Sequence, residues 1–288
     1  MEHFSLIVLD LGGTKLNIGR YRGGKIEHSV IYPFDNSMTV SDSIDFLSDC
    51  IRDLILEDTK GIAIGVPSIV NVDQGVVFNA VNIQSWQEVS LKKQLEQRFD
   101  LPVYVNNDVN CFTKGEHLSG CGKGYQDLVG LCLGTGMGAG IILQKNLYVG
   151  ANCCAGEVGG VRYLDGHLDD YCSGSFFKKH YLQCGSELAE RARSGDKQAL
   201  TAFEQFGEHL AIAIKHLLLM IDPQLIVIGG SVSESFDLFI ENVWKNLADF
   251  PYPNVIGNLE IKKSQQQNSA LLGAAQLYLE SKEIANVL

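Results

Sequence analysis

The composition is that of a folded, acidic protein of moderate size. The chain has 288 residues, 45% of them hydrophobic and 20% charged, which is enough apolar material for two ordinary domains or one large one and excludes a disordered chain. With 23 Lys and Arg against 34 Asp and Glu, the net charge is −11, which argues against nucleic acid or membrane surfaces as main partners. An anionic ligand must therefore be held locally, by backbone N–H groups or a metal ion.

No stretch approaches the roughly 18 consecutive apolar residues of a membrane helix. The start of the chain does not read as a signal peptide, because Glu2, His3, Asp10 and Lys15 interrupt it. We therefore expect a cytoplasmic protein. The eight cysteines are scattered without a CxxC pair, and we expect most of them to be small buried side chains.

The first half of the chain predicts strands interrupted by helices. Short apolar segments bounded by turn residues predict strands at residues 6–9, 16–21, 26–32, 62–66 and 103–105. One helix is expected at residues 44–55, capped by Ser41 or Ser43, and another at residues 90–99. Helices that alternate with short buried strands indicate a mixed α/β sheet.

The second half starts like the first. Residues 131–136 (LCLGTG) match residues 9–14 (LDLGGT), with Gly134 lying 122 positions after Gly12. Each segment joins an apolar strand to a second strand and then a polar turn, which favours duplication over a chance match of two glycine turns. The remaining predicted elements are a helix at 196–221 capped by Asp196, a strand at 225–228, a helix from Ser233 and a helix at 269–280.

Two familiar nucleotide motifs are absent. Residues 19–25 (GRYRGGK) have the glycine and lysine spacing of a phosphate loop, but Ile26 replaces the hydroxyl residue that would ligate Mg²⁺, and a strand follows in place of a helix. Residues 134–140 (GTGMGAG) lead into a strand and so are not a dinucleotide fingerprint. Walker-type NTPases and Rossmann oxidoreductases are thereby excluded.

Two glycine and threonine hairpins remain as candidate phosphate sites. Small residues let a triphosphate approach the backbone, and the Thr14 and Thr135 hydroxyls can bind its oxygens. Asp10, directly before the first hairpin, can hold Mg²⁺ or its water. Each hairpin taken alone can equally be only a tight turn, and Asp10 a turn cap.

A polar run follows the strand at 103–105, at the carboxyl end where open α/β sheets bind ligands. Asp108 can accept a proton from an attacking hydroxyl, and the amides of Asn106, Asn107 and Asn110 can bind sugar hydroxyls. Asn and Asp also favour turns and helix caps for local reasons, and that alternative stays open.

Five motifs stand in the order and spacing of the ROK family of bacterial sugar kinases and sugar-responsive repressors. They are LDLGGTK at 9–15, NNDVN at 106–110, LGTGMGAG at 133–140, GEVGG at 156–160 and IVIGGSV at 226–232. The chain resembles this family over nearly its whole length. The resemblance implies the actin-like ATPase (ribonuclease H-like) α/β fold, with two duplicated lobes around a cleft, which we place at 1–111 plus 273–288 and at 112–272.

The resemblance also implies functional residues. It implies that ATP is bound by Gly12, Gly13, Thr14, Lys15, Gly134, Thr135, Gly136, Gly229 and Gly230. It implies Asp108 as general base, and a sugar site lined by Asn82, Asn107, Asp108 and Glu157. Repressors of the family carry a DNA-binding domain before the first hairpin, and because only five residues precede Leu6 here, we expect a kinase.

The chain departs from the family pattern in two places. Gly160 stands where relatives have a histidine that touches the sugar and ligates zinc, and residues 162–173 replace the cysteine cluster that supplies the other zinc ligands. Asp169 aligns with the glutamate that follows that cluster in relatives, and Ser68 stands where many relatives have a glycine beside the sugar. We expect no zinc site, and we count Asp169 and Ser68 among the substrate-binding residues.

The leading hypothesis is an ATP- and Mg²⁺-dependent kinase acting on a primary hydroxyl, O6 of a hexose. An N-acetylhexosamine kinase is the nearest alternative. A sugar-sensing protein that keeps the fold without turnover is the alternative from another class. The family further implies a homodimer.

Overall fold

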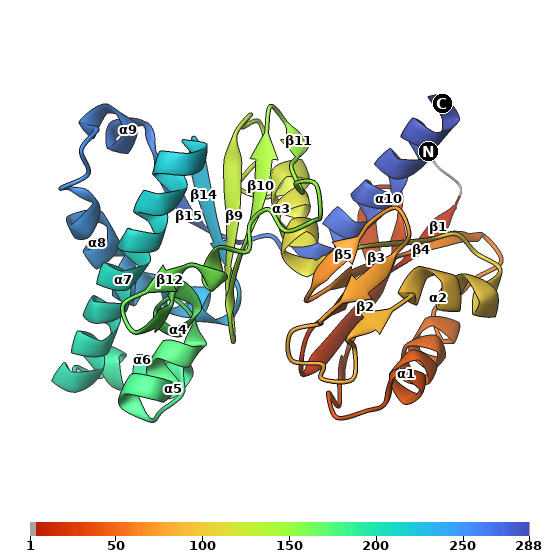
Figure 1. Cartoon of the computed structure of the whole chain (residues 1–288), viewed down its shortest axis with the longest axis horizontal. Helices are drawn as coiled ribbons and strands as arrows, with labels where there is room; N and C mark the ends of the chain where they lie inside the picture. The colour runs from red at the N-terminus through yellow and green to blue at the C-terminus, as the bar shows by residue number, and fades with distance from the viewer. Residues whose placement is uncertain (1–3, 288) are drawn as a thin grey trace. The chain divides into compact units, whose positions relative to one another are not determined.

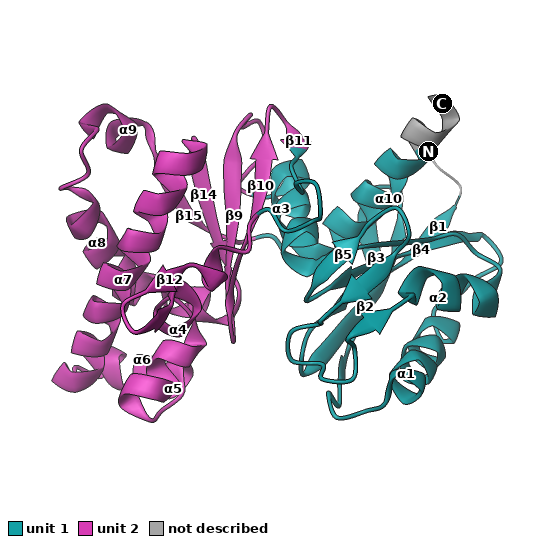
Figure 2. Ribbon diagram, viewed as in Figure 1, with its two compact units in different colours: residues 1–120, 147–155, 266–288 teal, residues 121–146, 156–265 magenta. Residues whose placement is uncertain are grey.

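The chain folds into two compact units, drawn in different colours in Figure 2. The computed structural model describes residues 4–287. Unit 1 comprises residues 1–120, 147–155 and 266–288, and unit 2 comprises residues 121–146 and 156–265.

These units differ from the expected lobes at each boundary. Helix α3 (Asp108–Ser119) packs along helix α10 (Ser269–Val287), so residues 112–119 stay with unit 1, where the sequence placed them in the second lobe. Residues 147–155 also belong to unit 1, and Cys153 and Val149 contribute to its core.

Unit 1 is built on a five-stranded mixed sheet in the order β3-β2-β1-β4-β8 (Figure 1). Its strands are β1 (Ser5–Leu11), β2 (Lys15–Arg22), β3 (Lys25–Pro33), β4 (Thr59–Val66) and β8 (Val103–Asn107). The first three are antiparallel, and β4 and β8 run parallel to β1. All five strands predicted for this half of the chain are therefore present, each extended at one or both ends.

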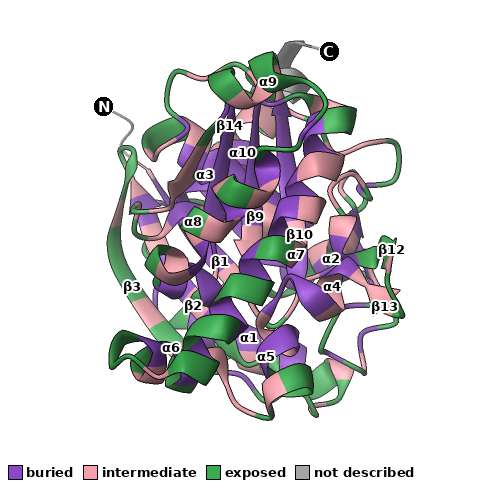
Figure 3. Cartoon of the chain, turned by 90° about the vertical axis from the view of Figure 1, so that its left-hand side faces the viewer, coloured by how far each residue is buried: buried purple, intermediate pink, exposed green. Residues whose placement is uncertain are grey.

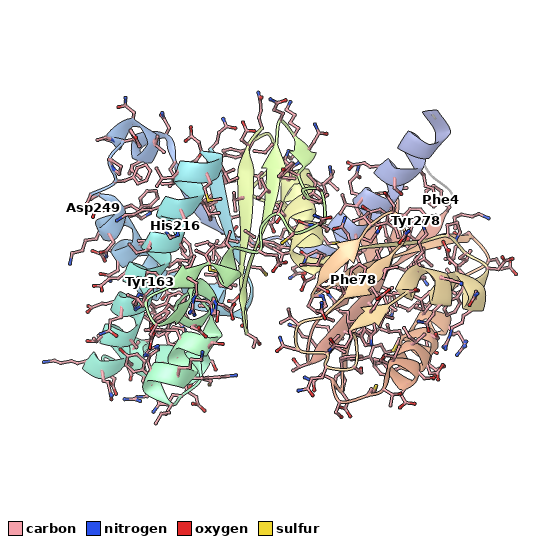
Figure 4. All side chains as sticks on the ribbon, in the orientation of Figure 1. Phe4, Phe78, Tyr163, His216, Asp249 and Tyr278 are labelled. Carbon is pink, nitrogen blue, oxygen red and sulfur yellow. The ribbon has the colours of Figure 1, made fainter. Side chains whose placement is uncertain are left out.

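Helices cover both faces of this sheet, because β1 alternates apolar side chains between them. Ile7 and Leu9 lie in a core with residues of α1 (Val40–Arg52) and α2 (Leu91–Phe99). Leu6 and Val8 point to the other face and pack with residues of α10. Tyr278 of α10, labelled in Figure 4, donates its hydroxyl to the Lys60 carbonyl at 2.9 Å and fastens the helix to β4.

The structure corrects the cap expected for α1. Thr39 is the N-cap, and its hydroxyl accepts the backbone N–H of Asp42 at 3.2 Å. Ser43 is instead buried, and its hydroxyl accepts the indole N–H of Trp86 at 2.8 Å. The contact with Trp86 places Ser43 inside the protein, which is why this serine does not cap the helix.

A small antiparallel sheet was missed. It consists of β5 (Ile69–Asn71), β6 (Val76–Phe78) and β7 (Glu88–Val89). Strands of two or three residues are too short to show an alternating pattern, which explains why periodicity did not predict them. Phe78 of β6 is labelled in Figure 4.

Unit 2 repeats the architecture of unit 1. Its sheet has the order β11-β10-β9-β14-β15, in which the first three strands are antiparallel and the last two run parallel to β9 or to each other. The strands are β9 (Leu128–Leu133), β10 (Met137–Leu143), β11 (Asn146–Leu147), β14 (Leu225–Gly229) and β15 (Glu260–Lys263). The matching strand order supports the duplication inferred from residues 9–14 and 131–136.

Helices α7 (Lys197–Ile221) and α8 (Phe236–Leu247) cover one face of this second sheet. Figure 3 shows the strands buried, while the outward side of α7 is exposed. Asp196 caps α7 by accepting the N–H groups of Gln198 and Ala199, as predicted. The smaller elements of this unit are η1 (Val158–Gly160), β12 (Arg162–Tyr163), β13 (Gly166–His167), α4 (Leu168–Tyr171), α5 (Gly174–Tyr181), α6 (Gly185–Arg193), η2 (Ser231–Ser235) and α9 (Pro253–Asn258).

Candidate functional site

The first hairpin joins β1 to β2, and backbone N–H groups at its tip are available to bind a ligand. Gly12 donates its N–H to the Lys15 carbonyl at 2.8 Å, and the Thr14 carbonyl accepts the N–H of Phe34 at 2.9 Å. Within residues 4–287, the N–H groups of Gly13 and Thr14 donate to no protein acceptor. Thr14 and Lys15 are exposed, so this tip presents two N–H groups, a hydroxyl and an ammonium group to an anion.

The second hairpin, residues 134–136, has the same property. Gly134 donates its N–H to the Gly136 carbonyl at 2.9 Å. The N–H groups of Thr135 and Gly136 have no acceptor in the part of the chain that the structure describes, and Thr135 is exposed. Each unit thus carries one candidate anion site at the equivalent connection of its sheet.

Three strand ends meet at one edge of the first sheet. Strands β1, β4 and β8 are parallel, and their register places Asp10 beside Gly65 and Gly65 beside Asn106. Burial raises the pKa of the Asp10 carboxyl to about 6, an effect that the positive charge of Lys15 opposes. Among the described residues no group donates a hydrogen bond to this carboxylate. A bound divalent cation would compensate the cost of burying its charge.

Asp108 is the first residue of α3, immediately after β8. Asn107 caps the helix by accepting the N–H of Asn110 at 3.0 Å, and the Asp108 carboxylate accepts the N–H of Val109 at 2.9 Å. The buried thiol of Cys111 has a pKa raised by burial and by the carboxylates of Asp10 and Asp108. Both carboxylates therefore lie near this thiol, at the edge where the parallel strands end.

The neighbouring amides are largely occupied inside the protein. Asn106 and Asn110 are each 1% exposed, and the Asn106 side-chain oxygen accepts from the Asn110 amide at 3.1 Å. Asn106 also donates to the Tyr104 hydroxyl at 2.9 Å. These two side chains support the local structure, which is the alternative left open for them from sequence. Asn107 is 8% exposed, and its side-chain amide donates to the Ser68 carbonyl at 3.2 Å.

Ser68 and Asn82 lie on loops of unit 1. Ser68 is buried, and its hydroxyl donates to the Phe78 carbonyl. Asn82 is exposed and has a left-handed backbone with φ of 65°. The Asn82 β-carbon lies 2.6 Å from the position of a β-carbon on Gly13, so this candidate sugar residue packs directly on the first hairpin.

Unit 2 brings Glu157 and Asp169 near each other. Desolvation and the negative charge of Asp169 raise the pKa of Glu157. Burial raises the pKa of Asp169, and the hydrogen bond from the Met137 N–H partly offsets this by lowering it. Asp169 accepts this N–H bond at 2.5 Å, directly after the second hairpin. Gly156 holds the loop close to β10, because a β-carbon there would lie 1.8 Å from the Ala139 carbonyl oxygen.

Gly229 and Gly230 lie beside the second hairpin. Gly229 ends β14 opposite Cys132 of β9. Gly230 has a φ of 82°, and a β-carbon there would meet the carbonyl oxygen of Leu133 at 2.4 Å. Only glycine fits this close approach, which carries the chain past the start of the hairpin.

Comparison with known proteins shows the family of the chain. A family model described as the ROK family matches residues 6–281. The chain belongs to the ROK family. It is 26% identical over 317 residues to the glucokinase of Thermotoga maritima, covering 97% of this chain and 99% of that protein. It is 31% identical over 266 residues to the N-acetyl-D-glucosamine kinase of Yersinia enterocolitica, covering 81% and 86%.

A solved ROK structure confirms the fold. The ROK family glucokinase from Streptomyces griseus, determined in complex with glucose and AMPPNP, matches this chain with a TM-score of 0.83 and 26% sequence identity. The match covers 95% of this chain and 98% of that one. Together with the repeated strand order, it confirms the duplicated actin-like ATPase fold that the motifs predicted.

The two places where the chain departs from the ROK pattern are Gly160 and the segment 162–173. Gly160 is exposed, and a β-carbon added there would meet nothing within 4 Å. The segment that replaces the cysteine cluster begins with the β12–β13 hairpin, which carries Tyr163, labelled in Figure 4. The Tyr163 hydroxyl lies 3.0 Å from Nδ1 of His209 on α7. Polar and aromatic contacts thus anchor this segment of the ROK chain.

Among residues 4–282, whose side chains the structure describes, no group of three or more His, Cys, Asp or Glu side chains is arranged to hold a metal ion. None of the eight cysteines, all of which lie among the described residues, is in a disulfide bond; Cys50, Cys111, Cys153 and Cys172 are buried, and Cys154 is exposed. The absence of zinc stays a prediction. In the same described range, no helix of this ROK protein is long and apolar enough to span a membrane.

Proposed function

We propose that this ROK protein is an ATP-dependent sugar kinase that transfers the γ-phosphoryl group to a primary hydroxyl, O6 of a hexose. The observation that carries the proposal is the pair of hairpins, one in each duplicated unit, each of which has two N–H groups and a threonine hydroxyl with no partner in the part of the chain that the structure describes. Backbone donors of this kind bind phosphate oxygens without a net positive charge on the protein. The glucokinase and N-acetylglucosamine kinase relatives support a sugar as the acceptor.

ATP is assigned to the residues around these hairpins. Gly12, Gly13, Thr14 and Lys15 bind phosphate oxygens from unit 1, and Gly134, Thr135 and Gly136 do so from unit 2. Gly229 and Gly230, which lie beside the second hairpin, approach the adenosine. Preorganised N–H groups of this kind stabilise charge that develops on a transferring phosphoryl group.

Asp108 is the proposed general base. Its carboxylate accepts the proton of the sugar hydroxyl while the sugar oxygen forms a bond to the γ-phosphorus. The bond from the γ-phosphorus to the β–γ bridging oxygen breaks in the same step, and ADP leaves with that electron pair. The place of Asp108 at the end of β8, in the first turn of α3, supports this role because ligands bind beyond such strand ends.

Mg²⁺ fits the environment of Asp10. The carboxyl is desolvated, precedes the first hairpin and accepts no hydrogen bond in the described chain. Asp10 would hold the ion directly or through a water molecule, and the bound ion would neutralise phosphate charge. Asp10 does so only when ionised, and burial makes that ionisation harder.

The proposed sugar residues are Asn82, Asn107, Asp108, Glu157, Asp169 and Ser68. Ser68 acts through its neighbours, since its hydroxyl is bound to the Phe78 carbonyl and its carbonyl to the Asn107 amide. The open space at Gly160 favours tolerance of a substituent at C2, which keeps N-acetylhexosamines as the second substrate class.

A sugar screen with ATP and Mg²⁺ tests the proposal, with ADP release and the phosphorylated product as the readouts. Glucose, mannose, N-acetylglucosamine and N-acetylmannosamine are the first panel, and 6-deoxyglucose is the matched control because it lacks only the accepting hydroxyl. Turnover of a hexose with none for its 6-deoxy analogue supports the proposal. Sugar binding by calorimetry without turnover of any sugar would identify a sugar sensor instead.

A further inference from the structure

Residues of α4, of α5 and of the short segment between them bind backbone groups at the second hairpin. The N–H of Gly174 donates to the Gly134 carbonyl at 2.8 Å. The Ser173 and Ser175 hydroxyls each lie 2.9 Å from the Thr135 carbonyl. Met137, the first residue of β10 after the hairpin, donates its N–H to the Asp169 carboxylate. Residues 169–175 thus make four contacts with this region, which bind the carbonyls of Gly134 and Thr135 and the N–H of Met137.

Asp169 is enclosed where it makes this bond. A β-carbon on Gly136 would lie 2.8 Å from Oδ1 of Asp169, and one on Gly159 would lie 3.2 Å from the same oxygen. The backbone of Asp169 is fixed as well, because its carbonyl lies 2.6 Å from the Ser173 hydroxyl. The two glycines therefore provide the space in which this carboxylate reaches the hairpin.

We propose that Asp169 is a positioning residue for the nucleotide-binding hairpin, besides its proposed place among the sugar residues. This inference rests on the proposed kinase function. A carboxylate repels phosphate, so its bond to Met137 shapes the hairpin and does not itself bind the nucleotide. With the carbonyls of Gly134 and Thr135 held by residues 173–175, the N–H groups of Thr135 and Gly136 are left as the donors for phosphate.

The same geometry suits an aspartate at this position better than the longer glutamate. An extra methylene in glutamate would push the carboxylate against the positions beside Gly136 and Gly159, so one of the neighbours would have to move. The aspartate found where the family resemblance implies glutamate is then matched to this hairpin. Asp169→Glu, although it restores that glutamate, should damage nucleotide binding.

Three variants at one position separate the roles of Asp169. We expect Asp169→Ala to raise KM for ATP by about 10-fold or more, because a charge-assisted hydrogen bond is lost. Asp169→Asn keeps an oxygen at the same distance and should restore most of that loss, whereas Asp169→Glu should resemble the alanine variant. An unchanged KM for ATP in Asp169→Ala, with only the KM for the sugar raised, would overturn the inference.

Asp170 provides a matched control on the same helix. Its carboxylate accepts the N–H of His167 at 2.9 Å and binds Lys179, and it makes no contact with the hairpin among the described residues. Asp170→Ala therefore loosens α4 without removing the bond to Met137, and KM for ATP should stay within about 2-fold of the parent value. An increase equal to that of Asp169→Ala would mean that α4 stability alone is responsible, and the positioning role would be wrong.

Amide hydrogen exchange tests the positioning role without turnover. In Asp169→Ala the peptide covering residues 134–138 should exchange faster, while β14 should keep its protection. Unchanged exchange at the hairpin would overturn the inference even for an active kinase. If the parent protein phosphorylates no sugar, the proposed function fails, and faster exchange in the variant would still support the role of Asp169 in holding the hairpin.

Discussion

Gly65 of β4 lies directly against Asp108, since a β-carbon added to Gly65 would come within 3.2 Å of the Asp108 α-carbon. The first residue of α3 therefore sits on the end of the neighbouring strand, and its position is set by backbone packing. The Asp108 carboxylate is bound to the N–H of Val109 in its own helix. Changing the chemistry of this side chain should accordingly leave its backbone in place.

The first prediction is that Asp108→Asn lowers kcat by about 10²-fold or more, because the amide cannot accept the hydroxyl proton. The melting temperature and the affinity for AMPPNP, measured by calorimetry, should remain close to those of the parent. Asp108→Ala should show a similar loss of kcat. Turnover equal to that of the parent in either variant would refute the assignment of the base.

The second prediction concerns Asp10 and pH. Because burial raises its folded-state pKa from 3.8 to about 6, the folded state binds this proton more tightly than the unfolded state. The stability that the protonated group contributes is complete below about pH 4 and is lost as the pH rises through 6. The free energy of unfolding of Asp10→Asn minus that of the parent should thus increase between pH 4.5 and 7.5, by on the order of 2 kcal/mol.

Urea denaturation of the two proteins across this pH range measures that difference. A difference that stays constant with pH would show that Asp10 titrates normally. In the parent, kcat/KM for ATP should also rise with pH through about 6, because the ionised carboxylate is the form proposed to hold Mg²⁺.

The third prediction compares two adjacent glycines. A β-carbon on Gly12 would make ordinary contacts, at 3.4 Å or more, whereas one on Gly13 would overlap the Asn82 β-carbon at 2.6 Å. Gly13→Ala should therefore cost about 1 to 3 kcal/mol of stability and displace Asn82. Its KM should rise for both ATP and sugar, while Gly12→Ala should affect ATP alone. Equal sugar KM values for the two variants would show that Asn82 does not contact the sugar.

The fourth prediction is that Gly160→His changes the ranking of sugars more than it changes the affinity for ATP. The variant should fold normally, because the space around Gly160 is open. An imidazole there fills room beside a C2 substituent and adds a hydrogen-bond partner for hydroxyls. The ratio of kcat/KM for glucose to that for N-acetylglucosamine should rise several-fold. An unaltered ratio would place Gly160 away from the bound sugar.

The repeated architecture could be predicted from the amino-acid sequence. The apolar strand, glycine hairpin and second strand of residues 9–14 and 131–136 are local patterns, since each depends on side-chain alternation and on glycine at a turn. The Asp196 cap of α7 was predictable for the same reason, because capping joins residues only two and three positions apart. The repeated hairpins and the helix cap could each be predicted from a short segment of the sequence.

Which polar side chains are already hydrogen-bonded inside the protein depends on contacts that form only in the folded chain. The sequence predicted Ser41 or Ser43 as the cap of α1, whereas Thr39 caps it and Ser43 is taken up by a contact with Trp86, 43 positions away. Asn106 and Asn110 bind each other inside unit 1, and Asp169 reaches the N–H of Met137 across 32 positions. A buried polar group must find a partner wherever the folded chain brings one, so these choices depend on contacts that no local pattern contains.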